Sequence, residues 1–209
     1  MQDGELYESR FHYKENRSNA VFLFVIALIL CAFMSFTYWW RTHFGGVQVD
    51  GASMNMTLYD GEMLLMDYYR EGDRLDRGDV IVVDVREYPE CGDTDFLIKR
   101  LIAVEGDKLY CENGQIYICY AGEQSYAPLQ EDYAYYMNGD KHSYDFAEYT
   151  VGEGEVFFLG DNRNNSLDSR YQEGKSHLDR LYKQSDIYGV VPDWAIRYQT
   201  ILEKIFFAR

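Results

Sequence analysis

The fold prediction begins from the stretch Leu97-Ile98-Lys99-Arg100-Leu101-Ile102-Ala103. It lies inside a continuous apolar run, residues 96–104, which predicts a strand. Side chains alternate along a strand, so Lys99 shares a face with Leu97 and Leu101. A lysine in such surroundings is desolvated, which disfavours its charged form and lowers its pKa. Taken alone, the strand favours a simpler interpretation, in which the lysine snorkels from a sheet edge.

Short β-branched or apolar runs recur on both sides of this stretch. They are residues 62–68, 79–85, 109–112, 115–118, 155–159 and 187–191. Asn113-Gly114 is the strongest short hairpin signal. The sequence therefore predicts a mainly β, antiparallel domain. Residues 201–207 are expected to form a terminal helix, and the tyrosine-rich residues 121–150 to leave the sheet as a cap or variable loop.

The N-terminal part of the chain predicts a membrane anchor. Residues 20–40 carry no charge and would span roughly 31 Å as a helix, enough to cross a bilayer core. Bulky aromatics stand where a cleavage site would need small residues, so the anchor is expected to be retained. We expect a tail at 1–17, an anchor at 18–40 and an extracytoplasmic domain at 41–209. Basic residues set this orientation, with Arg10, Lys14 and Arg17 before the anchor and Arg41 directly after it.

Composition narrows the class of partner. The 209 residues carry a formal net charge of −15, which argues against nucleic acid, and membrane contact must come from apolar insertion into the lipid bilayer. The histidines and cysteines show no metal-ligand spacing, so neither metal nor cofactor is expected. Cys91 could pair with Cys111 or Cys119 in an oxidising exterior. Cys111 and Cys119 are themselves too offset across the hairpin for an easy bridge.

A second stretch, Val49-Asp50-Gly51-Ala52-Ser53-Met54, holds a candidate nucleophile. Little side-chain bulk guards Ser53, so a substrate backbone could approach it, although most such serines are turn residues. A neutral Lys99 amine could take the proton of this hydroxyl. A Ser-His-Asp arrangement is disfavoured, because no histidine lies near these segments.

Four motifs, in order, resemble those of type I signal peptidases, the membrane-anchored Ser/Lys proteases that remove signal peptides from exported proteins. They are Gly51-Ala52-Ser53-Met54 with Thr57-Leu58, Arg77-Gly78-Asp79-Val80-Ile81-Val82, Ile98-Lys99-Arg100-Leu101-Ile102-Ala103 with Gly106-Asp107, and Gly160-Asp161-Asn162-Arg163-Asn164-Asn165-Ser166-Leu167-Asp168-Ser169-Arg170. The resemblance implies a serine endopeptidase at the outer surface of the cell membrane, acting on secretory preproteins.

The resemblance also implies roles for single residues. Ser53 would be the nucleophile and, through its backbone N–H, an oxyanion donor, and Lys99 would be the general base. Ser166 would orient the lysine amine. Asp168 and Arg170 would brace the site, and Asp161 with Arg100 would form a second bracing ion pair. Gly51 resembles the branch, common in Gram-positive bacteria, that lacks a serine hydroxyl at this position, which leaves the second oxyanion donor open.

Specificity for small residues at positions −1 and −3 is implied in the same way. The −1 pocket would be lined by Met54, Leu58, Leu97 and Ile98, and the −3 pocket by Val47, Val49, Leu64 and Val82. Each of them could equally be an ordinary core residue. The substrate would pair as an added strand with the edges near residues 47–50 and 96–98.

The chain departs from the family pattern at two positions that usually hold proline, Met56 and Glu105. If the backbone at residue 56 suits proline, Met56→Pro should stabilise by about 0.4–1 kcal/mol. Two alternatives stay open. One is a specialised Ser/Lys peptidase for a dedicated secretion, pilus or conjugation precursor, and the other is an anchored binding domain without activity.

Overall fold

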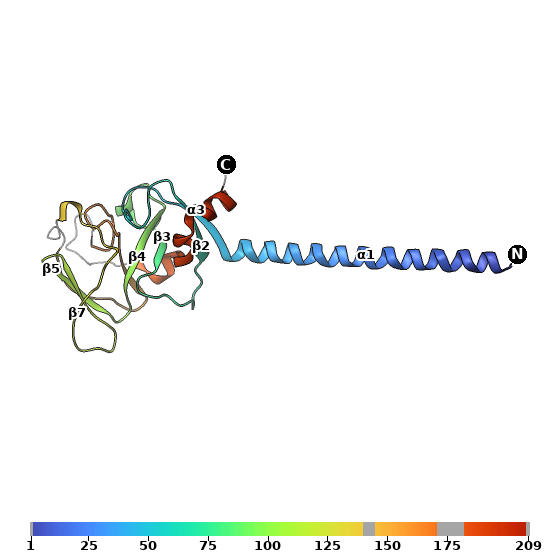
Figure 1. Cartoon of the computed structure of the whole chain (residues 1–209). Helices are drawn as coiled ribbons and strands as arrows, with labels where there is room; N and C mark the ends of the chain where they lie inside the picture. Colours follow the sequence, from blue (N-terminus) through green and yellow to red (C-terminus); the bar gives the residue numbers. More distant parts are fainter. Residues whose placement is uncertain (1, 140–144, 171–181, 208–209) are drawn as a thin grey trace. The chain divides into compact units, whose positions relative to one another are not determined.

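A computed structural model describes residues 2–139, 145–170 and 182–207 of the chain (Figure 1). The chain divides into two compact units, Met1–His43 and Phe44–Arg209. The first unit is helical and the second carries every described strand.

The first unit is one long helix, α1, Gln2–His43. Within its segment Asn19–His43, the most apolar 18-residue window has a mean hydropathy of 2.7, and none of that window is buried against protein. Within the described residues this is the one helix long and apolar enough to cross a membrane. Apolar side chains such as Phe22, Leu23 and Met34 lie exposed around it, which an isolated helix in water would not favour. The helix extends beyond the expected limits of 18 and 40 at both ends.

The larger sheet of the second unit has seven strands in the order β1-β2-β11-β3-β4-β9-β10, all paired antiparallel. Their bounds are Phe44–Gln48 for β1, Met63–Tyr68 for β2, Val80–Asp84 for β3, Phe96–Val104 for β4, Glu155–Leu159 for β9, Tyr182–Lys183 for β10 and Ile187–Val191 for β11. Strand β4 lies between β3 and β9 and is buried on both faces. That position explains why its sequence is almost continuously apolar.

The smaller sheet has four strands in the order β7-β6-β5-β8. They are β5 (Lys108–Glu112), β6 (Gln115–Cys119), β7 (Ala127–Pro128) and β8 (Phe146–Thr150). The turn between β5 and β6 has positive φ at both central residues, 51° at Asn113 and 71° at Gly114, as a two-residue hairpin requires. Cys111 faces Ile116 across this hairpin, and all four cysteines are free thiols.

Two apolar clusters hold the unit together. One covers a face of the larger sheet and includes Ile81, Leu101 and Phe158. The other fills the space between the two sheets, where Phe157 and Leu159 of β9 meet residues of β5 and β6 such as Leu109 and Ile118. Because the sheets share this second cluster, they form one folded body around β4 and β9.

The expectation of a mainly antiparallel β fold after an apolar N-terminal helix is confirmed. Strand β1 was not foreseen, because its Gly45-Gly46 pair breaks the β-branched pattern. Residues 121–150 contain β7, β8 and a short 3₁₀ turn, η2, Met137–Gly139. The C-terminal helix begins earlier than expected, after Pro192. It is divided into α2 (Asp193–Arg197), α3 (Gln199–Leu202) and a π-helical turn, η5 (Glu203–Phe207). Two further 3₁₀ turns, η1 (Pro89–Cys91) and η4 (Gln184–Asp186), lie between strands.

Candidate active site

Ser53 and Lys99 meet at the surface of the larger sheet. Ser53 lies in the turn between β1 and β2, and Lys99 lies in the middle of β4. The Nζ atom of Lys99 is 2.7 Å from Ser53 Oγ and donates a second bond of 2.8 Å to the carbonyl of Ile98. The lysine is 2% exposed, so its amine reaches the serine from inside the protein.

Burial sets the electrostatics of this pair. Desolvation lowers the pKa of Lys99 to about 8, against the opposing pull of nearby groups led by Asp168. Near pH 8, Lys99 is therefore a neutral amine in a substantial fraction of the protein molecules. Such an amine has a free lone pair facing a hydroxyl, which is what a general base needs.

The turn that carries Ser53 has its own local framework. Met54 and Leu58 are buried, and the N–H groups of Thr57 and Leu58 both donate to the Met54 carbonyl, at 3.0 and 2.8 Å. Gly51 has φ +87° and donates its N–H to Asp60 Oδ1 at 2.8 Å, so that N–H is not available to a substrate. Within the described residues the Ser53 N–H has no hydrogen-bond partner, which leaves it open to an oxyanion.

The polar loop 160–170 packs directly on this turn. Asn162 donates its backbone N–H to the Ser53 carbonyl and its side-chain amide to the Ala52 carbonyl, each at 2.9 Å. A Cβ on Gly160 would lie 2.6 Å from the Ser53 carbonyl oxygen and 2.2 Å from Ser166 Oγ. Only glycine therefore allows the loop to approach so closely.

Two buried ion pairs fix the loop. Arg100 binds Asp161 with two bonds of 2.8 and 2.6 Å, and Thr57 donates a 2.5 Å bond to the same carboxylate. Arg170 binds Asp168 with bonds of 2.9 and 2.8 Å. Burial opposes ionisation of Asp168, but the charge and hydrogen bonds of Arg170 outweigh it and lower the pKa of this carboxyl.

Ser166 makes no hydrogen bond with Lys99, whose amine is bonded to Ser53 and Ile98. The Ser166 hydroxyl is buried without a hydrogen bond of good geometry among the described residues, although it lies close enough to Asp168 to help lower the pKa of that carboxyl. Its expected role as the residue that orients the lysine stays a prediction.

A cleft of about 560 Å³ opens beside the serine and lysine. Of the eight expected pocket residues, five line it: Val47, Val49, Met54, Leu97 and Ile98. The other three, Leu58, Leu64 and Val82, are not among the residues that line it, and each is 1% exposed in the interior. In this structure these three are core residues, and their expected part in the −1 and −3 pockets stays a prediction. Three aspartates, Asp50, Asp93 and Asp95, complete the rim.

The two departures from the family pattern have different outcomes. Met56 has φ +82°, far from the value near −65° that proline imposes, so the expectation that proline would suit this position is wrong. Its side chain is 62% exposed and fills no gap. At the second position, the Glu105 side chain accepts a 3.0 Å hydrogen bond from the Gly154 N–H, a tie between two turns that proline could not make.

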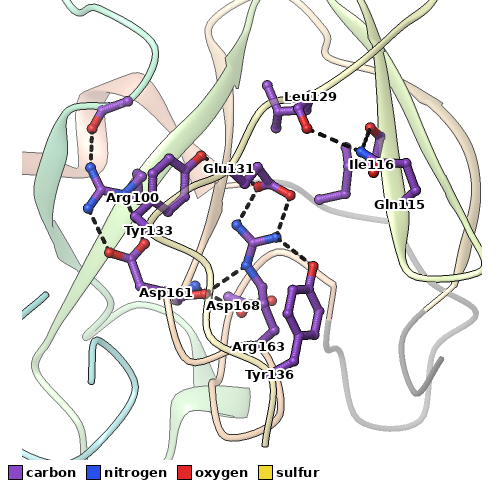
Figure 2. Close-up of polar contacts among 12 residues, drawn as sticks. Arg100, Gln115, Ile116, Leu129, Glu131, Tyr133, Tyr136, Asp161, Arg163 and Asp168 are labelled. Carbon is purple, nitrogen blue, oxygen red and sulfur yellow. Dashed lines mark hydrogen bonds and ion pairs between the residues drawn. The ribbon is translucent and has the colours of Figure 1, made fainter. Parts of the chain in front are cut away.

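Some residues of the site were quoted in motifs but given no role, namely Gly160, Asn162, Arg163 and Thr57. The contacts of Thr57, Asn162 and Gly160 join segments more than a hundred residues apart, and Arg163 binds Glu131, 32 residues away. No local pattern reveals contacts over such separations. Glu131 and Tyr133 lie outside the motifs, in the segment to which no function was assigned. Figure 2 shows Glu131 and Tyr133 beside the 160–170 loop.

Comparison with known proteins identifies the family of this chain. Residues 18–195 match the model of the signal peptidase family, peptidase S26. A signal peptidase I of Bacillus licheniformis is 31% identical over 159 residues, covering 74% of this chain and 81% of that protein. Signal peptidase I U of Bacillus subtilis (strain 168) is 32% identical over 160 residues, covering 75% of this chain and 81% of that protein.

A crystal structure of a signal peptidase I from Enterococcus faecalis V583 is 27% identical and covers 57% of this chain and 98% of that chain, with a TM-score of 0.42. A superposition at this score does not by itself establish a common fold. The family match covers most of the chain, and the sequence relatives extend over three quarters of it. The chain therefore belongs to the signal peptidase family, peptidase S26, and is a serine peptidase of the signal peptidase I type.

Proposed function

We propose that Ser53 and Lys99 form a catalytic dyad that cleaves signal peptides from secretory preproteins at the outer surface of the membrane. The observation that carries the proposal is the 2.7 Å approach of a buried amine with a pKa of about 8 to the serine hydroxyl. No histidine lies among the residues that line the cleft. The lysine is therefore the available base.

In the first half of the reaction, neutral Lys99 takes the hydroxyl proton as Ser53 Oγ attacks the scissile carbonyl. The oxyanion that forms accepts a hydrogen bond from the Ser53 N–H. The Lys99 ammonium then donates its proton to the departing amine, and the carbon–nitrogen bond breaks. This leaves the signal peptide as an ester on Ser53 and releases the mature protein.

The second half repeats these proton transfers with water. Neutral Lys99 takes a proton from the attacking water, and the ammonium returns it to Ser53 Oγ as the ester bond breaks. The signal peptide leaves as a carboxylic acid, which ionises at neutral pH. The Asp161–Arg100 and Asp168–Arg170 pairs touch neither reacting group and act by holding the surrounding loop.

The cleft supports selectivity for an extended peptide with small residues at −1 and −3. Its apolar walls come from β1 and from the start of β4. Strand β1 is the edge of its sheet, and β9 pairs with β4 only from Arg100 onward, so both segments have an open side within the described residues. An added strand could bond to either one. Large or charged side chains would be rejected by sterics and desolvation.

The apolar helix supports a location in the cell membrane. Asn19–His43 would cross the bilayer once, with the N-terminal tail, which carries Arg10, Lys14 and Arg17, in the cytoplasm and residues from 44 onward outside. Such an anchor would hold the cleft next to the membrane-inserted part of a preprotein. Local concentration of the substrate would then support its capture.

The test is incubation of the full-length protein with a secretory preprotein, with the cut site read by mass spectrometry. Wild type should cut once, after a small residue, whereas Ser53→Ala, Lys99→Ala and Lys99→Arg should not cut although they stay folded. The arginine variant is decisive, because a guanidinium cannot lose its proton in this pH range. Cleavage by any of the three would refute the dyad. Failure of wild type on several preproteins would favour a dedicated precursor or a binding domain without activity.

A further inference from the structure

Residues 129–137, which we call the strap, run from the smaller sheet to the 160–170 loop. At its first end, Leu129 donates its N–H to the Ile116 carbonyl at 2.8 Å and accepts a 3.1 Å bond from the Gln115 side chain. Its other end lies along the loop. Tyr135 donates its N–H to the Asp161 carbonyl at 2.7 Å. The strap therefore connects β6 with the 160–170 loop (Figure 2).

The backbone contacts continue beyond that bond. The Tyr135 carbonyl accepts the Arg163 N–H at 2.9 Å, and Tyr135 forms a parallel bridge with Asn162. The Met137 N–H donates a 2.6 Å bond to the Asn164 side chain. One side of the 161–164 segment is thus bonded to the strap. Its other side is bonded to the Ser53 turn through Asn162.

A buried ion pair locks this arrangement. The guanidinium of Arg163 is 1% exposed and binds both oxygens of Glu131, whose side chain is 7% exposed. Arg163 also donates its Nε–H to the Gly160 carbonyl at 3.1 Å. Arg163 therefore links Glu131 to Gly160, the glycine that packs against the Ser53 carbonyl. An arginine so deeply buried needs this carboxylate, because removing one partner of a buried pair leaves an uncompensated charge.

Tyr133 adds a second contact from the strap. Its ring lies 4.1 Å from the guanidinium carbon of Arg100 and 5.9 Å from that of Arg163. Arg100 is the partner of Asp161, so the ring supports the ion pair next to the Ser53 turn. The Tyr133 hydroxyl is 3.4 Å from Glu131, a long hydrogen bond. Tyr133 thus contacts Arg100 through its aromatic face and Glu131 through its hydroxyl.

We propose that Glu131 is a positioning residue of the peptidase, which acts through Arg163 and Asn162 to hold the Ser53 turn against Lys99. Glu131 touches neither reacting group and does not line the cleft. Its loss should therefore leave substrate binding almost intact and slow the chemical step. A small misplacement of reacting groups is enough to cost about 100-fold in rate.

The inference rests on the proposed dyad, and its test uses steady-state kinetics of the full-length enzyme on a preprotein peptide. Measurements are made well below the Tm of each variant, so that unfolded enzyme does not contribute. Glu131→Gln should lower kcat by about 10- to 100-fold and change KM by less than about threefold. Glu155→Gln is the matched control, because Glu155 bonds to Gly152 and Tyr149 instead of the loop. It should keep both constants near wild type.

A double variant tests whether Glu131 acts through Arg163. If the two form one unit, Glu131→Gln with Arg163→Met should be no slower than the worse single variant, within about threefold. Should Glu131→Gln fail to fold, Tyr133 decides. Tyr133→Leu should lower kcat by about tenfold, and Tyr133→Phe, which keeps the ring, should not.

The outcomes separate the two proposals. Cleavage by Ser53→Ala or Lys99→Ala would overturn the dyad itself. If those variants are inactive while Glu131→Gln, or in its absence Tyr133→Leu, keeps the wild-type kcat, only the positioning role is overturned. A raised KM with unchanged kcat would also overturn it, because the strap would then be acting on the cleft.

Discussion

Met56, three residues after the nucleophile, should respond to proline and glycine in opposite ways. Proline would force φ from +82° to near −65°, a rotation of about 150° within the turn. Three hydrogen bonds depend on the present path: the Thr57 and Leu58 N–H bonds to the Met54 carbonyl, and the Thr57 hydroxyl bond to Asp161. Loss of packing adds nothing, because the methionine side chain is 62% exposed.

The magnitude follows from these bonds. At about 0.5–1.5 kcal/mol each, they contribute about 1.5–4.5 kcal/mol to the free energy of unfolding. Proline restricts the unfolded chain and returns about 0.4–1 kcal/mol. Met56→Pro should therefore destabilise by about 0.5–4 kcal/mol, which lowers the Tm of a domain of this size by about 1–16 °C. Met56→Gly removes about 1–2 kcal/mol of left-handed strain at a cost of about 0.5–1 kcal/mol, so it should be neutral or stabilising.

Thermal unfolding by circular dichroism, followed by kcat/KM on one preprotein peptide, provides the assay. The full-length protein in detergent serves for all three forms. Met56→Pro should also lose activity, because the turn it disrupts carries Ser53. A proline variant that melts at or above wild type, together with a glycine variant that melts lower, would refute the left-handed conformation and the reasoning built on it.

Four further results are expected. Because the folded pKa of Lys99 lies near 8, below the unfolded value near 10.5, kcat/KM should rise with pH through about 8, and a profile rising only near 10.5 would contradict burial as the cause. The same lowered pKa makes the lysine destabilising at low pH, so Lys99→Met should raise unfolding free energy by roughly 3 kcal/mol below pH 8, a gain that vanishes by about pH 10.5. Gly160→Ala should abolish cleavage, since its Cβ would overlap the Ser53 carbonyl oxygen, and a wild-type kcat in this variant would disprove that contact. Protease added to intact protoplasts should degrade residues beyond 44 and spare the N-terminal tail, and protection of the domain would reverse the proposed orientation.

Local patterns were sufficient for the central strand and for the hairpin. Alternation along 96–104 places Lys99 on one face with Leu97 and Leu101, although the strand taken alone favoured a lysine snorkelling from a sheet edge, and Lys99 is in fact 2% exposed. Asn113-Gly114 likewise predicts its turn from the φ values that these two residues tolerate. The resemblance to a family supplied the pairing of Arg100 with Asp161, which spans 61 residues and has no local signal.

What the sequence could not provide depended on tertiary contacts. The left-handed backbone at Met56 is set by the bonds on either side of it, and methionine itself does not favour that conformation. Ser166 was assigned by resemblance alone, and its hydroxyl faces Gly160 and Asp168 in the structure. The contacts of the strap could not be predicted, because its polar residues bind partners that lie elsewhere in the chain. From the sequence alone, Glu131 is indistinguishable from an exposed surface glutamate, and only the fold brings Arg163 beside it.

The contacts of the Ser53 turn also have a consequence for the order of events during biosynthesis. The residues that complete its geometry, Asp161 and Asn162, are made 104 to 110 residues after the segments they bind. A chain emerging from the N-terminal end therefore exposes its nucleophile long before the catalytic arrangement can close, and closure over such separations is slow. On the proposed mechanism, the nascent peptidase should therefore stay inactive until the chain has been made beyond Asn162 and has folded.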